Sequence, residues 1–365
     1  MAVRRIGLIL LVGFAAFAFF AIGVGPDRIN PWLSGFLGLR PPTPVFPREV
    51  SRAEEVTARV LDTVSGADVR RLMARFTGHG SRVPGYPGHE AAAGFIRQEF
   101  ERLGLRDVRT EAFDVTSPVD RGGRLTLVKN GVSFPIYAVW PNLVKTSTLP
   151  RWGVRTRLVY GGKGTFGEFN GHDMEGAAVL MAFNSWNNWL NAATLGAGQI
   201  IFIEPDSTFY TEAEQKFLQV PNRVERFWID KASGETLQRL LAEEGELEVE
   251  LNARMDWEKL SAHNILGTVP GTDPELRDQI VVISAYYDAM SVVPALAPGA
   301  EMACGIVALM ELVDYFSRYP PARTVLFLAT SSHHLGFRGI CDFLGRHARK
   351  AVSYTHLTLP TKRIV

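Results

Sequence analysis

The runs Gln279-Ile-Val-Val-Ile-Ser-Ala285 and Thr324-Val-Leu-Phe-Leu-Ala-Thr330 decide the fold, because each is an apolar, strand-like segment. Between them lies Ala303–Ser317, whose apolar residues recur with the period of a helix: Ile306, Leu309, Met310 and Val313. Strand, helix and strand in this order predict a parallel βαβ unit whose strands are buried on both faces. Ligands of open parallel sheets bind beyond the carboxyl ends of the strands. The candidate functional residues therefore lie in Tyr286-Tyr287-Asp288 and in Ser331-Ser332-His333-His334.

An amphipathic helix precedes this unit, after the glycine-rich loop Gly78–Gly88, and ends at Gly104. Its apolar face consists of Ala92, Phe95, Ile96, Phe100 and Leu103. Residues 150–258 differ in character, because short β-like runs are broken there by glycine and asparagine before a helix near Gly234–Glu244. We expect residues 51–149 and 259–351 to form one α/β domain and residues 150–258 to form a β-rich insert.

The N-terminal segment predicts a membrane anchor. Arg4 and Arg5 precede Ile6–Val24, an uncharged run of membrane-spanning length, and Gly25-Pro26-Asp27 ends it. A cleaved signal peptide is the alternative, although its apolar core is usually shorter. With the arginines inside, residues after Pro26 face the periplasm or the cell exterior. Residues 1–26 are therefore interpreted as a signal anchor, and the proline-rich residues 27–50 as a stiff linker.

The overall charge argues against nucleic acid as a partner. The chain has 365 residues, with 39 basic and 38 acidic side chains and a net charge of +1. No basic excess is present to bind a phosphate backbone. Cys304 and Cys341 are the two cysteines, and their spacing fits neither a disulfide framework nor a zinc cluster. We expect two free, partly buried thiols, while a disulfide between them stays possible.

Several motifs in this order resemble metallopeptidase family 28, the di-zinc aminopeptidases related to bacterial leucyl aminopeptidase, with nicastrin and the transferrin receptor as membrane relatives. The resemblance covers about residues 66–345 and is carried by the loop Gly80–Gly85, the segment Asn264–Thr272 and the βαβ unit. The insert resembles a protease-associated domain through Tyr160–Gly164, Asn170–Gly176 and Ala192–Ala197. The resemblance implies an aminopeptidase-like, mostly parallel sheet with flanking helices, zinc as cofactor, and a lid or partner surface in the insert.

Carried over residue by residue, the family's site is altered in this chain. After the first strand the family has His-x-Asp, in which the histidine binds zinc and the aspartate orients it. Tyr286 stands at the ligand position, and Asp288 keeps the orienting acid. A phenol with a pKa of about 10 is a poor zinc ligand at neutral pH. Packing at the strand end is the alternative role for Tyr286, and capping of the next turn is the alternative for Asp288.

The remaining motifs depart in the same way. The family's Asn-Asp-Asp-Ala-Ser-Gly, with its bridging aspartate, corresponds to Ala300–Gly305, where Glu301 lies at the bridging position and Met302 replaces the second acid. The family's Glu-Glu-x-Gly, which supplies a general base and a ligand, corresponds to His333-His334-Leu335-Gly336. Both histidines are able to bind zinc or accept a proton, and Glu301 is equally compatible with a solvated loop acid.

Two functions follow from the resemblance. The first is a catalytically degenerate, membrane-anchored, extracytoplasmic domain that acts as a scaffold or binds a peptide or protein through its cleft or insert. The second is an active zinc aminopeptidase that uses His334 and Glu301 as non-standard ligands.

The C-terminal residues 352–365 resemble the conceptual translation of a sequencing adapter. We expect them to be non-native, the peptidase-like domain to be C-terminally truncated, and the shortened sheet to leave an unpaired edge that promotes aggregation.

Overall fold

The computed structural model describes the backbone of residues 47–217 and 222–354 and the side chains of residues 54–217 and 222–347. The predicted anchor, most of the predicted linker and residues 355–365 of the predicted tail lie outside these ranges. Within them, no helix is both long and apolar enough to cross a bilayer. The chain divides into the compact units Met1–Asp62 and Thr63–Val365. Helix α3 (Pro47–Thr63) makes up the described part of the first unit.

The described residues of the second unit form an α/β domain. Its helices are α4 (Gly66–Thr77), α5 (Pro87–Arg102), α6 (Trp189–Thr194), α7 (Tyr210–Glu214), α8 (Lys231–Glu244), α9 (Cys304–Arg318) and α10 (Arg338–Tyr354). Short 3-10 helices are η2 (Phe166–Phe169), η3 (Pro294–Leu296) and η4 (Glu301–Ala303). The strands are β1 (Arg106–Leu127), β2 (Ser133–Ala138), β3 (Val154–Tyr160), β4 (Ala178–Ala182), β5 (Gln199–Ile203), β6 (Glu225–Ile229), β7 (Leu247–Val269), β8 (Ile280–Tyr286) and β9 (Thr324–Thr330).

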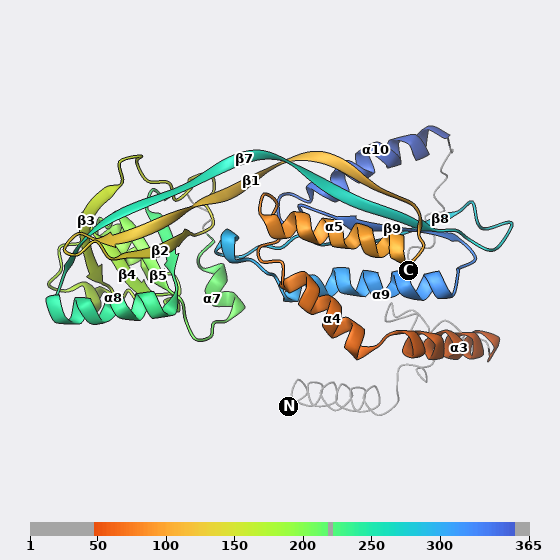
Figure 1. Cartoon of the computed structure of the whole chain (residues 1–365), viewed down its shortest axis with the longest axis horizontal. Helices are drawn as coiled ribbons and strands as arrows, with labels where there is room; N and C mark the ends of the chain where they lie inside the picture. Colours follow the sequence, from red (N-terminus) through yellow and green to blue (C-terminus); the bar gives the residue numbers. More distant parts are fainter. Residues whose placement is uncertain (1–46, 218–221, 355–365) are drawn as a thin grey trace, which may run out of the picture. The chain divides into compact units, whose positions relative to one another are not determined.

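All these strands join one mixed sheet in the order β1-β2-β6-β5-β4-β3-β7-β9-β8, with a further pairing of β1 with β7. The sheet is parallel across β3, β4, β5 and β6 and again between β8 and β9. The predicted βαβ unit is therefore confirmed. The long strands β1 and β7 are antiparallel and pair from Arg106↔Thr268 to Leu127↔Val249, and they run side by side in Figure 1. This ribbon links the two parallel regions.

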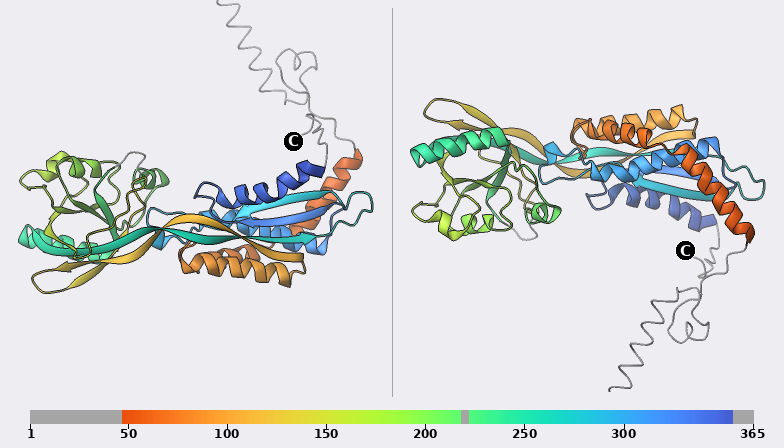
Figure 2. Two further views of the ribbon diagram at one scale, coloured as in Figure 1. Left: turned by 90° about the horizontal axis from the view of Figure 1, so that it is seen from above. Right: turned by 90° about the horizontal axis from the view of Figure 1, so that it is seen from below.

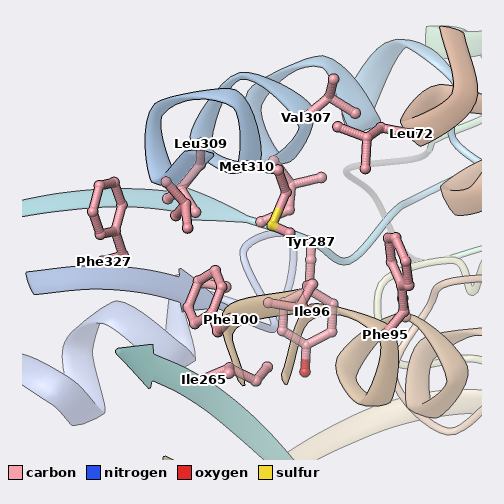
Figure 3. Packing of buried hydrophobic residues seen from close by; sticks show 14 of the residues in the cluster. Leu72, Phe95, Ile96, Phe100, Ile265, Tyr287, Val307, Leu309, Met310 and Phe327 are labelled. Carbon is pink, nitrogen blue, oxygen red and sulfur yellow. The ribbon is translucent and has the colours of Figure 1, made fainter. Parts of the chain in front are cut away.

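The first core lies between the sheet, at strands β7, β8 and β9, and helices α4, α5 and α9 (Figure 3). The helix face predicted for residues 92–103 enters this core, because Ala92, Ile96 and Phe100 are fully buried. Alternate residues of a strand face opposite sides of a sheet. Phe327 of β9 accordingly joins this core, while Leu328 packs with Phe343 of α10 on the other face. Figure 2 shows α5 and α10 on opposite sides of the sheet.

A second hydrophobic core lies around strands β3 to β6. It combines Leu158, Leu180 and Ile201 from three parallel strands with Leu237 of α8. Residues from before the predicted insert also join it, since Leu125 of β1 and Ile136 of β2 belong to the same cluster. The ends of the ribbon and the hairpin β1–β2 thus share one core with residues 150–258.

Strand β8 differs from the prediction that both strands of the βαβ unit are buried. Ile280, Val281 and Val282 expose 63%, 43% and 46% of their surface, respectively. The reason is position, because β8 is the outermost strand and pairs with β9 alone among the described residues. The burial expected for an internal parallel strand is therefore wrong here, whereas β9 is buried as predicted.

Candidate functional site

The carboxyl ends of β8 and β9 bring together three of the predicted site residues. The Tyr286 ring is stacked on the His333 ring, with centroids 4.0 Å apart and planes at 16°. His334 meets both rings edge-on, at 5.5 Å from Tyr286 and 5.0 Å from His333. Both histidines follow Ser332, whose backbone has a φ of +59°, so the chain turns sharply directly after β9. The parallel pairing of Tyr286 with Thr330 fixes this proximity.

Asp288 connects the two strand ends through a hydrogen bond. Its carboxylate is fully buried, and Oδ1 accepts a hydrogen bond of 3.1 Å from the His333 backbone N–H. Burial raises the pKa of Asp288 above its ordinary value. Burial also lowers the pKa of His334, whose Nε2 is buried without a partner among the described residues, like Oδ2 of Asp288. Asp288 therefore positions the histidine turn and is inaccessible to a ligand from solvent.

Glu301 lies in the loop before α9, and, together with burial, its charge contributes to the raised pKa of Tyr286. It is exposed at the first residue of η4, while Met302 turns inward and its sulfur accepts the Met290 backbone N–H at 3.2 Å. Cys304 and Cys341 are free and exposed, so the prediction of free thiols is confirmed and that of partial burial is wrong. The solvated loop acid considered from the sequence describes Glu301 as it lies here.

The four altered family positions form no set of converging metal donors. Tyr286 presents its ring face to His333, and burial raises the pKa of its phenol, so the oxygen stays protonated at neutral pH. Within residues 54–217 and 222–347, no three histidine, cysteine or acidic side chains lie together as metal ligands. The protonated phenol of Tyr286 is a poor match for the zinc-ligand position that the resemblance assigns to it.

Arg82 is a site residue that the motif comparison missed. Its guanidinium is fully buried, and Nε donates to the Tyr287 carbonyl at 2.9 Å. Its other nitrogens donate to the carbonyls of Phe76, Pro298 and Gly299. Burial lowers its pKa. Arg82 ties the loop before α5 to the end of β8 and to the loop before Glu301, which explains why an arginine belongs in that glycine-rich loop.

A second group of residues that the sequence did not predict lies around Tyr287. Because neighbouring strand residues face opposite sides, Tyr287 points away from His333 and stacks on His89, at 5.1 Å between ring centroids. Nε2 of His89 lies 2.6 Å from Oγ of Ser331, and Nδ1 lies 3.2 Å from Oε1 of Glu90. His89 and Ser331 are fully or almost fully buried. The Tyr-Tyr-Asp motif contained this signal, since its second tyrosine had to face the opposite side.

Comparison with solved structures identifies the fold of the domain. The chain superimposes on a zinc aminopeptidase from Bacillus subtilis with a TM-score of 0.52 at 18% identity, covering 79% of this chain and 66% of that one. A family 28 peptidase precursor from Shewanella amazonensis gives a TM-score of 0.52 at 14% identity, covering 81% and 71%. The fold is that of the zinc aminopeptidases.

Comparison with curated protein sequences finds shorter stretches of similarity. The chain is 31% identical over 91 residues to a protein named vacuolar membrane protease from Lachancea thermotolerans, and 34% identical over 97 residues to one of the same name from Laccaria bicolor. These matches cover 25% and 26% of this chain and 9% of each relative. No family model matches the chain. The matched stretch thus spans only a small part of the curated relatives.

Proposed function

We propose that this domain is a catalytically degenerate zinc-aminopeptidase fold that acts as a scaffold or peptide-binding module. The stacking of Tyr286 on His333 is the main support for the proposal. By the resemblance, these two residues correspond to the family's first zinc ligand and its general base. A protonated phenol neither binds zinc well nor accepts a proton at neutral pH.

The charge of the four positions supports the same conclusion. Tyr286, Glu301, His333 and His334 replace a histidine, an aspartate and two glutamates of the family's pattern, so carboxylates are lost at two positions. Carboxylates strengthen the hold on dications in a cleft of low dielectric constant. Since Asp288 is buried, Glu301 is the exposed acid within the three family site motifs that can bind a peptide's amino terminus.

Activity measurements test this proposal. Full-length protein with aminoacyl-nitroanilide substrates and added zinc is expected to show no zinc-dependent turnover and less than one bound zinc per chain. The variants His333→Ala and His334→Ala are expected to behave like the wild type, as is the control His347→Ala on α10. Zinc-dependent turnover that either site variant abolishes, and the control keeps, would overturn the proposal.

That result would favour the second candidate, an active zinc peptidase using His334 and Glu301. One observation speaks for it: Nε2 of His334 and Oδ2 of Asp288 are both buried without a hydrogen-bond partner among the described residues, and the charge of Asp288 acts on His334, as a second-sphere acid acts on a metal-binding histidine.

We also propose that the domain is held outside the cytoplasm by the predicted anchor Ile6–Val24. The name of the curated relatives supports a membrane location, and Arg4 and Arg5 set the orientation by the positive-inside rule. Protease added to intact cells or spheroplasts is expected to digest the domain. Protection that ends only when the membrane is lysed would reverse the orientation.

A further inference from the structure

A basic groove of about 750 Å³ lies along the ribbon, away from the candidate site. Three segments line it: Arg121–Arg124 of β1, Thr148–Arg151, and Asn252–Asp256 of β7. They are fixed to one another, because the Leu149 N–H donates to the Ala253 carbonyl at 3.0 Å and the Met255 N–H donates to Oγ1 of Thr148 at 2.9 Å. We call this feature the arginine groove.

Four arginines supply its charge: Arg121, Arg124, Arg151 and Arg254. Arg121 pairs with Glu258, and Arg254 lies 2.6 Å from Asp256. Arg124 and Arg151 are both exposed, and neither contacts a carboxylate among the described residues. The groove therefore keeps two uncompensated guanidinium groups, whose planar fork suits phosphate oxygens.

An exposed tryptophan lies beside one of these arginines. Pro150–Gly153 form a tight turn, closed by a 2.8 Å hydrogen bond from the Gly153 N–H to the Pro150 carbonyl. The turn presents Trp152 with 84% of its surface exposed, next to Arg151. Further along the same edge of β7, Val144 is 82% exposed, and its carbonyl accepts the indole N–H of Trp257 at 2.9 Å. Trp257 is an odd-numbered residue of β7 and faces the side opposite to Arg254 and Asp256, so it lies outside the arginine groove.

The loop that carries Val144 contains a strained position, Leu143. It is 46% exposed and has a φ of +52°, a region that bulky residues rarely adopt. The Asn142–Lys145 bridge, with hydrogen bonds of 2.9 Å in both directions, holds the loop in this form. Such strain persists where surrounding contacts impose it and is concentrated at functional sites.

We propose that this surface docks on an anionic bilayer, with lipid phosphates in the arginine groove and Trp152 in the headgroup region. Basic residues beside exposed tryptophan and aliphatic side chains are the combination that binds membrane interfaces. A tryptophan has an apolar ring and a polar N–H, so it is stable at the boundary between lipid and water. This inference rests on the membrane location proposed above and is independent of catalysis.

Tryptophan quenching tests the docking. Full-length protein is reconstituted into nanodiscs of phosphatidylcholine alone or with phosphatidylserine, using acyl chains brominated near the headgroup to quench nearby tryptophans. The wild type is expected to be quenched more in the anionic nanodiscs. Trp152→Phe should remove this difference, whereas Trp186→Phe, a control at another exposed tryptophan, should keep it. Arg124→Gln and Arg151→Gln should each lower the docked-to-undocked ratio about fivefold, and exposed Arg70→Gln should not.

Co-migration of protein with the nanodiscs reports the anchor separately from docking. Equal quenching of wild type and Trp152→Phe in anionic nanodiscs would overturn the proposal. Equal quenching in the two lipid compositions would do so too. Release of the surface by inorganic phosphate, at an ionic strength matched with sodium chloride, would assign the groove to a small anion instead of a bilayer.

Discussion

Glu212 and Lys216 form a buried ion pair, 2.9 Å apart, that fixes the backbone of Trp186. Oε1 of Glu212 accepts the Ser185 and Trp186 N–H groups, and Nζ of Lys216 donates to the Trp186 carbonyl. These bonds hold Trp186 at a φ of +49°. The pair also lies against the rings of Phe183 and Phe202. Each charge thus depends on its partner.

Removing one charge of this pair is expected to destabilise the domain strongly. Glu212→Gln keeps the size of the side chain but leaves a buried ammonium without its counter-charge, which costs about 3 kcal/mol of unfolding free energy. The matched change Asp206→Asn breaks an exposed pair with Lys231 and should cost less than about 1 kcal/mol. Urea unfolding of both variants measures the difference, and equal losses would contradict it.

For individual residues, the sequence predicted which side chains lie near one another better than it predicted their specific contacts. The meeting of Tyr286 with His333 follows from their places after parallel strands. The bond between His89 and Ser331 joins residues 242 apart in the chain, and no local pattern signals it. Arg82 lies in the loop Gly80–Gly85, which carries part of the family resemblance. Its role depends on the carbonyls of Tyr287 and Gly299, which only the folded backbone brings together.

Among the elements, strand β1 depends on Asp120 at its irregular point. The pairing with β7 shifts register between Asp120 and Gly123. Oδ1 of Asp120 accepts the Gly122 N–H and Oδ2 accepts the Ala138 N–H of β2, each at 2.9 Å. Both carboxylate oxygens are therefore used, and they stabilise the bulge and the neighbouring strand together.

Asp120→Asn should lower the unfolding free energy by about 1–3 kcal/mol, because the amide offers one acceptor where two are needed and buries an NH₂ group. Asp114→Asn, an exposed residue of the same strand, is the control and should change stability by less than about 1 kcal/mol. Thermal and urea unfolding measure both. A smaller loss for Asp120→Asn than for the control would show that water replaces the missing acceptor.

Element types were predicted well where periodicity was strong. The helix after Gly78–Gly88 and the strands of the βαβ unit lie where expected, as do the short strands of residues 150–258. The long strands β1 and β7 were missed. Each passes from one core to the other, so its apolar pattern changes along its length: β1 is mostly exposed at Arg106–Thr110, where Val108 is half-buried, and is buried at Ser117–Val119. A pattern that follows two different cores gives no single period.

For the whole molecule, strand β8 is expected to affect behaviour in solution, because one of its edges has no paired strand among the described residues. An unpaired apolar edge is a template for association with another strand. Val281→Lys should reduce aggregation of purified protein severalfold, since a charge on an edge opposes pairing. Val132→Lys, at a similarly exposed valine in the β1–β2 turn, is the control. Light scattering at equal concentration measures both, and equal aggregation would remove β8 as the cause.

The antiparallel ribbon has a consequence for the evolution of this architecture. Strands β1 and β7 are still paired at Asp120↔Met255, so an Asn-Gly turn joining these two residues would close a hairpin and leave every pairing from Arg109↔Leu266 to that point intact. Everything between, including β2 to β6, would leave with the deletion. A single exchange in the gene can therefore add or remove residues 121–254, so the history of these residues and that of the strand ends carrying Tyr286 and His333 are free to diverge.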